Sequence, residues 1–460
     1  MTDEKKLSTG RSIFLLIIAV ATLLTLVIFV KSPTTISLAI SAMIEIIFCM
    51  VWGFTWDELQ RDIIENVKRM MPAVLILLCV GMLVGSWILC GTVPLLVYYG
   101  LKFLSPGIFL FAACIICSIT SIFTGTSWGT LSTVGIALMA VSAGLGIPAY
   151  YTAGAVTVGA IFGDKLSPLS DTTVLASAVA EVDIREHMKH MLYTTLPGWI
   201  ISLILYLFIG LSFKKGTFNA EMTDLIIKTI ADKFNLNILL LLPPIIVLYL
   251  IFKGKPAIPV FGAGIILGAI FALVFQGAGV KTIATTLNSG FQISTGVAAV
   301  DKMLMRGGLS SMLGTVALLI FSAVFGSPLK TAGVIDMIVN KIQEVAKNDK
   351  QIMVSTYILH SLLFTIIGSY YVTFSAFGPI FKKVFDKYYL HGKNLSRLLE
   401  DTGTAFAPLV PWSVTGAFVA STLGVATGEF ALFAPMLYLG IILGITYSIT
   451  GFKIIKIDKV

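Results

Sequence analysis

The chain has 460 residues, of which 57% are hydrophobic and 12% are charged, and its net charge is +8. A soluble domain carries about 25% charged residues. So few charges exclude a soluble globule of this size, a disordered chain, a coiled coil and a disulfide scaffold. The apolar runs are helix-length and lack the strand alternation of an outer-membrane barrel. We therefore expect an all-α polytopic membrane protein.

The basic residues gather at positions that suit cytoplasmic loops. They precede the first apolar run at Lys5, Lys6 and Arg11 and recur at 382–397 and 453–459. The positive-inside rule then places both termini in the cytoplasm, which requires an even number of crossings among about eleven to fourteen apolar segments. No basic stripe is interleaved with aromatic residues, so a nucleic-acid partner is not expected.

The first 69 residues predict two spans and a surface helix. Ile13–Val30 and Ile36–Trp52 are apolar and helix-length. In Trp56–Arg69 charged and apolar residues alternate at the spacing of an amphipathic helix that lies in the membrane interface. The next run, Pro72–Leu89, spans again, and Thr92–Leu104 is a short apolar segment.

A polar stretch divides the remaining chain near its middle. Residues 213–236 hold seven charged side chains and are long enough for a loop with a short helix. Many transporters consist of two inverted halves joined by such a linker. We expect a first transport repeat at 70–212 and a second at 237–460, with broken or re-entrant helices at the membrane midplane. A helical hairpin without further significance is the alternative for the polar stretch.

Two acid-bearing segments break the rule that spans lack charge. The first, 159–173, contains Gly163 and Pro168 and the acids Asp164 and Asp171. Irregular backbone at membrane depth persists only where it lines a cavity or packs in protein. Its carboxylates and the hydroxyls of Ser170, Thr172 and Thr173 are oxygen ligands suited to Na⁺. Lys165 is a possible charge partner for Asp164 in the empty state, and a solvated interfacial loop is the alternative.

The second segment, 399–413, repeats these ingredients. It holds Glu400 and Asp401, then Thr402, Thr404 and two prolines. Ala-Pro-Leu at 407–409 echoes Ser-Pro-Leu at 167–169. One such break in each half is expected of a site at a repeat interface. We predict one shared pocket in which Asp164, Asp171 and Asp401 bind Na⁺.

Small hydroxyl and aromatic residues precede each break, and Trp412 and Ser413 end the second one. They predict further oxygen ligands from Thr126 and Ser127, and possible substrate contacts from Trp128, Ser369, Tyr370, Trp412 and Ser413. Close helix packing is the alternative role for these small residues.

The remaining acids and histidines support weaker hypotheses. Glu45 is isolated at span depth and is either a proton-titrating group or the partner of a packed polar side chain. Asp301 is expected to pair with Lys302 or Arg306. His187 and His190 are expected in a solvated turn. The chain lacks a phosphate-binding loop, a His-Glu-x-x-His motif and a nucleophile elbow, so neither an enzyme nor an ATP-driven pump is expected.

At these residues the chain resembles the NhaC family of bacterial Na⁺/H⁺ antiporters. The resemblance rests on 85–94, 124–130, 162–173, 306–308 and 398–412, in order along nearly the whole chain. It implies the broken-helix fold of the ion-transporter superfamily, and an exchange of Na⁺ for H⁺ or of Na⁺/H⁺ coupled to small organic substrates. The chain departs from the family pattern at Ser369-Tyr370 and at Lys330, where an acid is common.

We therefore expect a secondary transporter that exchanges Na⁺ for H⁺ across the bacterial inner membrane by alternating access. Its partners are the lipid bilayer, Na⁺ and H⁺, with a homodimer possible and no cofactor beyond the transported ions. One alternative is Na⁺-coupled exchange of a small carboxylate or amino acid, for which Lys165, Asn288 and Gln292 are candidate contacts. A membrane-embedded enzyme or channel is the second alternative.

Overall fold

The computed structural model of the chain describes residues 7–168, 170–213, 220–334, 337 and 348–457. Within these residues, ten helices are long and apolar enough to cross a membrane, or up to twelve if each of two bent helix pairs is one span. The chain is an all-α polytopic membrane protein. Positions 214–219 of the expected linker, and Leu169 in the short sequence echo, lie outside the described residues.

The first part of the chain contains ten α-helices and two short π-helical segments. They are α1 (Thr9–Leu24), η1 (Thr25–Phe29), α2 (Thr34–Val51), α3 (Trp56–Leu89), α4 (Thr92–Phe103), α5 (Pro106–Thr124), α6 (Ser127–Thr130), η2 (Leu131–Gly135), α7 (Ile136–Gly144), α8 (Ala149–Lys165), α9 (Asp171–Val179) and α10 (Ile184–Phe213).

The second part is similarly divided into long helices and short breaks. Its elements are α11 (Ala220–Lys233), η3 (Ile238–Leu241), α12 (Leu242–Phe252), α13 (Ala257–Gln276), α14 (Val280–Ser289), α15 (Ala298–Leu304), η4 (Leu309–Met312), α16 (Leu313–Thr331), α18 (Asp349–Ile367), α19 (Tyr370–Lys387), α20 (Gly392–Leu399), η5 (Glu400–Ala405), η6 (Ala407–Leu409), α21 (Val414–Leu423), α22 (Thr427–Phe430), η7 (Ala431–Phe433) and α23 (Pro435–Thr450).

Helix α3 differs from the sequence expectation. A capping box between Thr55 and Glu58 starts it, because each side chain accepts a hydrogen bond from the other residue's backbone. The helix then continues through Pro72 to Leu89. The predicted interfacial helix and the span after it are therefore one helix, and position 69 is not an element boundary.

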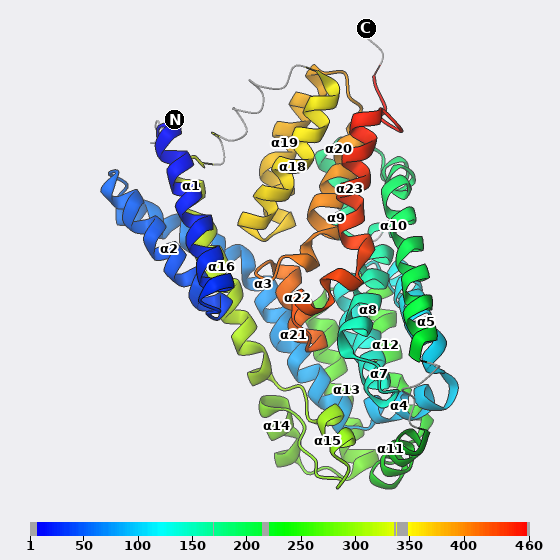
Figure 1. The fold of residues 1–460 in the computed structure, drawn as a ribbon. Coiled ribbons are helices and arrows are strands. Elements are labelled where there is room, and N and C mark those ends of the chain that lie inside the picture. Colours follow the sequence, from blue (N-terminus) through cyan, green and yellow to red (C-terminus); the bar gives the residue numbers. More distant parts are fainter. Residues whose placement is uncertain (1–6, 169, 214–219, 335–336, 338–347, 458–460) are drawn as a thin grey trace.

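Helices α1, α2 and α16 form a group beside the rest of the molecule, at the left of Figure 1. They share a separate hydrophobic core with residues such as Leu15, Leu38 and Phe325. Helix α1 begins and helix α23 ends at the same end of the molecule (Figure 1).

Glycines bring α8 against α5 and so position the first acidic break. A Cβ added to Gly159 would lie 2.3 Å from the Cys114 carbonyl oxygen, and one on Gly163 would lie 2.4 Å from that of Ser118. Only glycine at both positions allows the two backbones to approach this closely, as in membrane helix pairs with small residues four apart. The close packing holds the end of α8, where Asp164 follows Gly163, in the middle of the protein.

Two helix breaks in different halves have the same backbone geometry. Helix α5 ends at Gly125 with φ 70° and ψ 22°, and α18 ends at Gly368 with φ 71° and ψ 12°. The next residues, Thr126 and Ser369, are extended, with φ −150° and −140°. Glycine accommodates the left-handed conformation that ends each helix, and a hydroxyl residue begins the next one.

Candidate functional site

Asp164 lies buried at the end of α8, with 4% of its surface exposed. The Ser127 hydroxyl, at the start of α6, donates a hydrogen bond of 2.6 Å to its Oδ2 atom. Its Oδ1 atom has no hydrogen-bond partner among the described residues. An unsatisfied carboxylate oxygen away from water is unfavourable unless a proton or a cation binds to it.

A cavity of 870 Å³ opens beside this carboxylate. Seven of the predicted site residues line it: Thr126, Ser127, Trp128, Asp164, Asp171, Ser369 and Tyr370. The indole of Trp128 stacks on Phe418 at 4.2 Å between ring centroids, which gives the cavity a firm apolar wall. Residues from both halves of the chain therefore meet at one cavity.

Asp171 lies at the other end of the first break, at the start of α9. Its Oδ1 accepts the Thr172 backbone N–H at 2.9 Å, and the Tyr371 hydroxyl donates to its Oδ2. Unlike Asp164 it is exposed, so water competes for its charge. Asp171 and Asp164 line the same cavity.

The neighbouring hydroxyls shape the break. The Ser170 hydroxyl caps α9 by accepting the Thr173 N–H at 3.5 Å and lies 3.0 Å from the Thr172 hydroxyl. The Thr173 hydroxyl donates to the carbonyl oxygens of Asp164 and Lys165, each at 3.3 Å. These three residues hold the irregular backbone and do not line the cavity.

Lys165 pairs with Asp401, and the expected pairing with Asp164 is wrong. The Lys165 ammonium lies 2.8 Å from Asp401 Oδ1, and the two side chains are 1% and 0% exposed. Thr194 donates to the same oxygen at 3.0 Å, and Tyr357 donates to Oδ2 at 3.2 Å. Consecutive residues on a helix point about 100° apart, so Asp164 faces the cavity while Lys165 reaches the second half.

The other residues of the second break also lie outside the cavity. Glu400 is fully buried, and both of its carboxylate oxygens lack a hydrogen-bond partner among the described residues. The Thr402 hydroxyl contacts His360 Nδ1 at 2.6 Å, and Thr404 is buried nearby in η5. Glu400, Asp401, Thr402 and Thr404 are thus not among the residues that line the cavity.

Trp412 and Ser413 have packing roles in the structure. The Trp412 indole donates to the Thr365 carbonyl oxygen at 2.6 Å, and the Ser413 hydroxyl caps α21 by accepting the Gly416 N–H at 2.8 Å. Neither residue lines the cavity.

Two basic residues that were not among the predicted site residues also line the cavity. They are Arg69, near the middle of α3, and Lys255, just before α13. Arg69 was visible only as one charge of an expected surface helix. The candidate substrate contacts Asn288 and Gln292 are exposed and away from the cavity.

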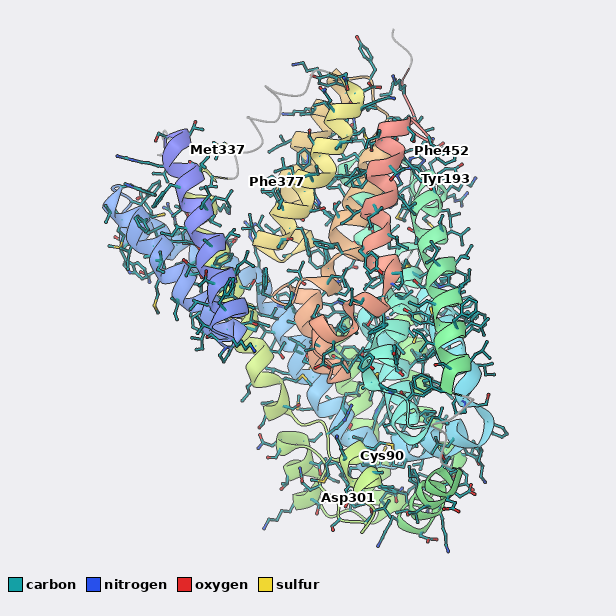
Figure 2. The ribbon with its side chains drawn as sticks, viewed as in Figure 1. Cys90, Tyr193, Asp301, Met337, Phe377 and Phe452 are labelled. Carbon is teal, nitrogen blue, oxygen red and sulfur yellow. The ribbon has the colours of Figure 1, made fainter. Side chains whose placement is uncertain are left out.

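Three further expectations are corrected or located. Asp301 lies at the lower end of the molecule in Figure 2. It accepts two hydrogen bonds from Thr295, at 2.8 and 2.7 Å, so the expected ion pair with Lys302 or Arg306 is wrong. His187 and His190 are buried, so the solvated turn is also wrong. Glu45 is fully buried in the α1–α2–α16 group, and its carboxylate lacks a partner among the described residues.

The two departures from the family pattern lie in different surroundings. Ser369 and Tyr370 line the cavity, whereas Lys330 is exposed at the end of α16. Within the described residues, no three His, Cys, Asp or Glu side chains gather as they do at a resident metal site.

Comparisons with known proteins find sequence similarity along nearly the whole chain. A profile described as the Na⁺/H⁺ antiporter family matches residues 6–183 and 159–452. A malate-2H⁺/Na⁺-lactate antiporter of Bacillus subtilis is 38% identical over 98% of this chain and 96% of its own. A Na⁺/H⁺ antiporter NhaC of Alkalihalophilus pseudofirmus is 35% identical over 98% of both chains. An arginine/ornithine antiporter, ArcD, of Halobacterium salinarum is 35% identical over 87% of this chain and 82% of its own.

Proposed function

Because the chain belongs to the Na⁺/H⁺ antiporter family, we propose that it exchanges Na⁺ for H⁺ across a bacterial inner membrane as a secondary transporter. One observation carries this proposal. The Asp164 carboxylate is buried, holds one oxygen without a partner among the described residues, and borders a cavity. Such a carboxylate binds either a proton or a cation, and an antiporter requires that the two ions compete for one site in this way.

The mechanism is competition for one carboxylate. A proton neutralises Asp164 in the absence of Na⁺. Na⁺ instead takes the charged carboxylate, with oxygen ligands from Ser127 and Thr126 and a second negative charge at Asp171. Because the site is occupied by one ion or the other when the cavity closes, movement of one ion across the membrane is coupled to return of the other.

The buried ion pair between Lys165 and Asp401 gives the second half of the chain a different role in this mechanism. Lys165 and two hydroxyl donors occupy both carboxylate oxygens of Asp401, so we propose that Asp401 does not bind the transported Na⁺. The pair also joins α8 of the first half to η5 of the second. We propose that it keeps the two halves in register as they move.

The proposed movement rests on two inverted repeats, 70–212 and 237–460. The matching breaks at Gly125–Thr126 and Gly368–Ser369 support this division. Alternating access then follows from one repeat rocking against the other, with both termini cytoplasmic. Each net charge moved contributes about 2.3 kcal/mol per 100 mV, so exchange of unequal numbers of ions responds to the membrane potential.

Reconstitution of the purified protein into proteoliposomes tests this function. Vesicles loaded with Na⁺ and diluted into Na⁺-free medium should acidify inside as Na⁺ leaves and H⁺ enters. Equal gradients of Li⁺ and K⁺ define the cation selectivity, and protein-free vesicles control for leakage. If the internal pH of the vesicles does not change with the Na⁺ gradient, the proposal is contradicted.

A second candidate function is Na⁺-coupled exchange of a small organic acid or amino acid. The cavity volume of 870 Å³ is that of a small-molecule site and far exceeds the need of a bare ion. Arg69 and Lys255 line it and suit a substrate carboxylate. Relatives named as malate/lactate and arginine/ornithine antiporters agree with this possibility.

Substrate-dependent transport at fixed pH and Na⁺ separates the two candidates. Malate, lactate and amino acids would be added in turn to the same vesicles. If the second function is present, Arg69→Gln and Lys255→Gln should remove the organic substrate's effect and leave simple Na⁺/H⁺ exchange. If no organic substrate changes the flux in the unaltered protein, only the first candidate stands.

A further inference from the structure

Tyr371 lies in the first turn of α19 and was not among the predicted site residues. Its hydroxyl donates a hydrogen bond to Asp171 Oδ2, and both residues line the cavity. The contact joins a side chain from the second half of the chain to an acid of the first half. The exchange proposed at Asp164 gives Tyr371 no role, so the contact needs an explanation of its own.

The two matching helix breaks each supply a hydroxyl group to one acid of the cavity. One break is followed by Ser127, which begins α6 and donates to Asp164 Oδ2 at 2.6 Å. The other break is followed by Tyr371, which donates to Asp171 Oδ2. Corresponding positions in the two halves therefore hold the two cavity carboxylates in the same manner.

The two carboxylates differ in the oxygen that is left over. Asp164 Oδ1 has no hydrogen-bond partner among the described residues. Asp171 Oδ1 accepts the Thr172 backbone N–H at 2.9 Å, and its Oδ2 accepts the Tyr371 hydroxyl. The Thr172 N–H belongs to the first turn of α9 and stays with that helix, whereas a hydroxyl group can turn away. Of the two donors to Asp171, only Tyr371 can yield its place to a cation.

Close packing of α9 and α19 places the hydroxyl beside the carboxylate. Ala176 of α9 and Phe374 of α19 belong to one hydrophobic core. A Cβ added to Gly378 of α19 would lie 2.0 Å from Val179 Cγ1 of α9, so the two helices are in close contact. The hydroxyl contact therefore follows from the packing of two helices.

The side chain of Tyr371 has room to move, unlike that of the preceding tyrosine. Tyr370 is 7% exposed and packs against η5, where a Cβ added to Gly403 would lie 3.4 Å from Tyr370 Cβ. Tyr371 is 43% exposed, and its ring contacts the Tyr370 ring at 4.5 Å between centroids. A change of rotamer can carry its hydroxyl away from Asp171 without disturbing the core.

The charge of Asp171 is what the hydroxyl and a cation would share. Asp171 is the first residue of α9, and a helix N-terminus favours a charged carboxylate. A hydroxyl that donates to this carboxylate satisfies part of its charge, as a bound cation would. The Tyr371 hydroxyl and Na⁺ therefore compete for the same oxygen.

We propose that Tyr371 is a positioning residue that occupies Asp171 Oδ2 when no Na⁺ is bound and turns away when Na⁺ binds. This inference rests on the proposed Na⁺/H⁺ exchange and specifies what limits the affinity of its cavity for Na⁺. Because Na⁺ must displace the hydroxyl, it binds more weakly than it would to an open carboxylate. The returning hydroxyl also helps to release it, and a transported ion must be held weakly enough to leave.

Tyr371→Phe tests the competition through the sign of its effect. The ring and its packing remain, but the donor is lost, so Na⁺ has no hydroxyl to displace. In proteoliposomes at a fixed alkaline pH, the half-saturating Na⁺ concentration should fall by about threefold, the effect of one hydrogen bond that water partly replaces. A merely structural role of Tyr371 would raise this concentration or would lower the maximal flux alone.

Binding of radioactive Na⁺ to the purified protein in detergent measures the same shift without transport. This measurement keeps the test decisive if the variant transports slowly. The binding curve of Tyr371→Phe should likewise move to about threefold lower Na⁺ concentration.

A double variant shows whether Tyr371 acts through Asp171. In Asp171→Asn with Tyr371→Phe, the half-saturating concentration should equal that of Asp171→Asn alone, because no charged carboxylate remains to be released. Tyr447→Phe is the matched control, since its hydroxyl donates to the Tyr193 carbonyl oxygen at 3.3 Å and neither residue lines the cavity. It should leave the Na⁺ dependence unchanged.

The outcomes separate this competition from the function on which it rests. If the unaltered protein lacks Na⁺-driven proton flux, the proposed function fails. If that flux is present and the half-saturating concentration of Tyr371→Phe is unchanged or raised, the competition is overturned, and a raised value makes the hydroxyl a Na⁺ ligand instead. A fall that persists in the double variant overturns the action through Asp171. Loss of Na⁺ binding in Tyr371→Phe overturns the competition as well, because the residue then supports the fold.

Discussion

The two acidic helix breaks have similar sequences but different surroundings. In the first, Asp164 borders a cavity and keeps one oxygen without a partner among the described residues. In the second, Asp401 is enclosed and accepts from Lys165, Thr194 and Tyr357. A carboxylate whose oxygens are all bonded has no need of a cation, whereas one with a free oxygen beside a cavity does. The comparison supports our proposal that ion exchange occurs at Asp164, because the carboxylate of Asp401 is already paired.

Asp164→Asn should have the largest effect on transport. The amide keeps the size of the side chain and its contact with Ser127, but it holds neither a proton nor the charge that attracts Na⁺. We expect Na⁺-driven proton flux in proteoliposomes to fall by about a hundredfold or more. Equal amounts of folded protein in the membrane are the control. A variant that exchanges ions at the unaltered rate would place the ion site elsewhere.

Breaking the buried pair should chiefly affect stability. Lys165→Met leaves Asp401 buried without its cation, which costs about 3–5 kcal/mol of folding free energy. The double variant Lys165→Met with Asp401→Asn should regain most of this loss, because neither charge remains. Thermal unfolding of the three proteins in detergent measures the coupling. If the two changes destabilise additively, the pair is not the contact that joins the halves.

Asp171→Asn should have an intermediate effect. Asp171 is exposed and already bonded by Tyr371, so its charge assists Na⁺ binding without being the exchanging group. We expect the half-saturating Na⁺ concentration to rise by about tenfold, which corresponds to about 1.4 kcal/mol, with maximal flux retained. Tyr371→Phe, which keeps the carboxylate, should change this concentration less. A complete loss of flux in Asp171→Asn would make the two acids equal partners.

Ser413→Ala should have the smallest effect on transport. Ser413 caps α21 and does not itself line the cavity, so its loss should lower stability by about 1 kcal/mol and leave the flux unchanged. Ser127→Ala offers the opposite pattern, with weaker Na⁺ binding and little change in stability, because Ser127 contacts Asp164 directly. Equal transport defects in both variants would remove the distinction between the two breaks.

Much of the architecture could be predicted from residue patterns. Low charge and helix-length apolar runs predicted the polytopic helical fold, and charged residues next to Gly and Pro located both breaks. The pattern misjudged α3, because Pro72 continues the helix where a boundary was expected. It also misjudged His187 and His190, since charged neighbours such as Glu186 suggested solvent and the structure buries both rings against α20.

The sequence by itself determined that this chain spans a membrane and that acids such as Asp164, Asp171, Glu400 and Asp401 lie in its helix breaks. Those conclusions depend on composition and local spacing, whereas the expectation of an ion antiporter depended on the resemblance to the NhaC family. Only the tertiary structure decided which acid borders a cavity and which is held by a lysine. That choice depends on helix packing, because Gly159 and Gly163 bring α8 against α5 and direct Asp164 and Lys165 to opposite neighbours.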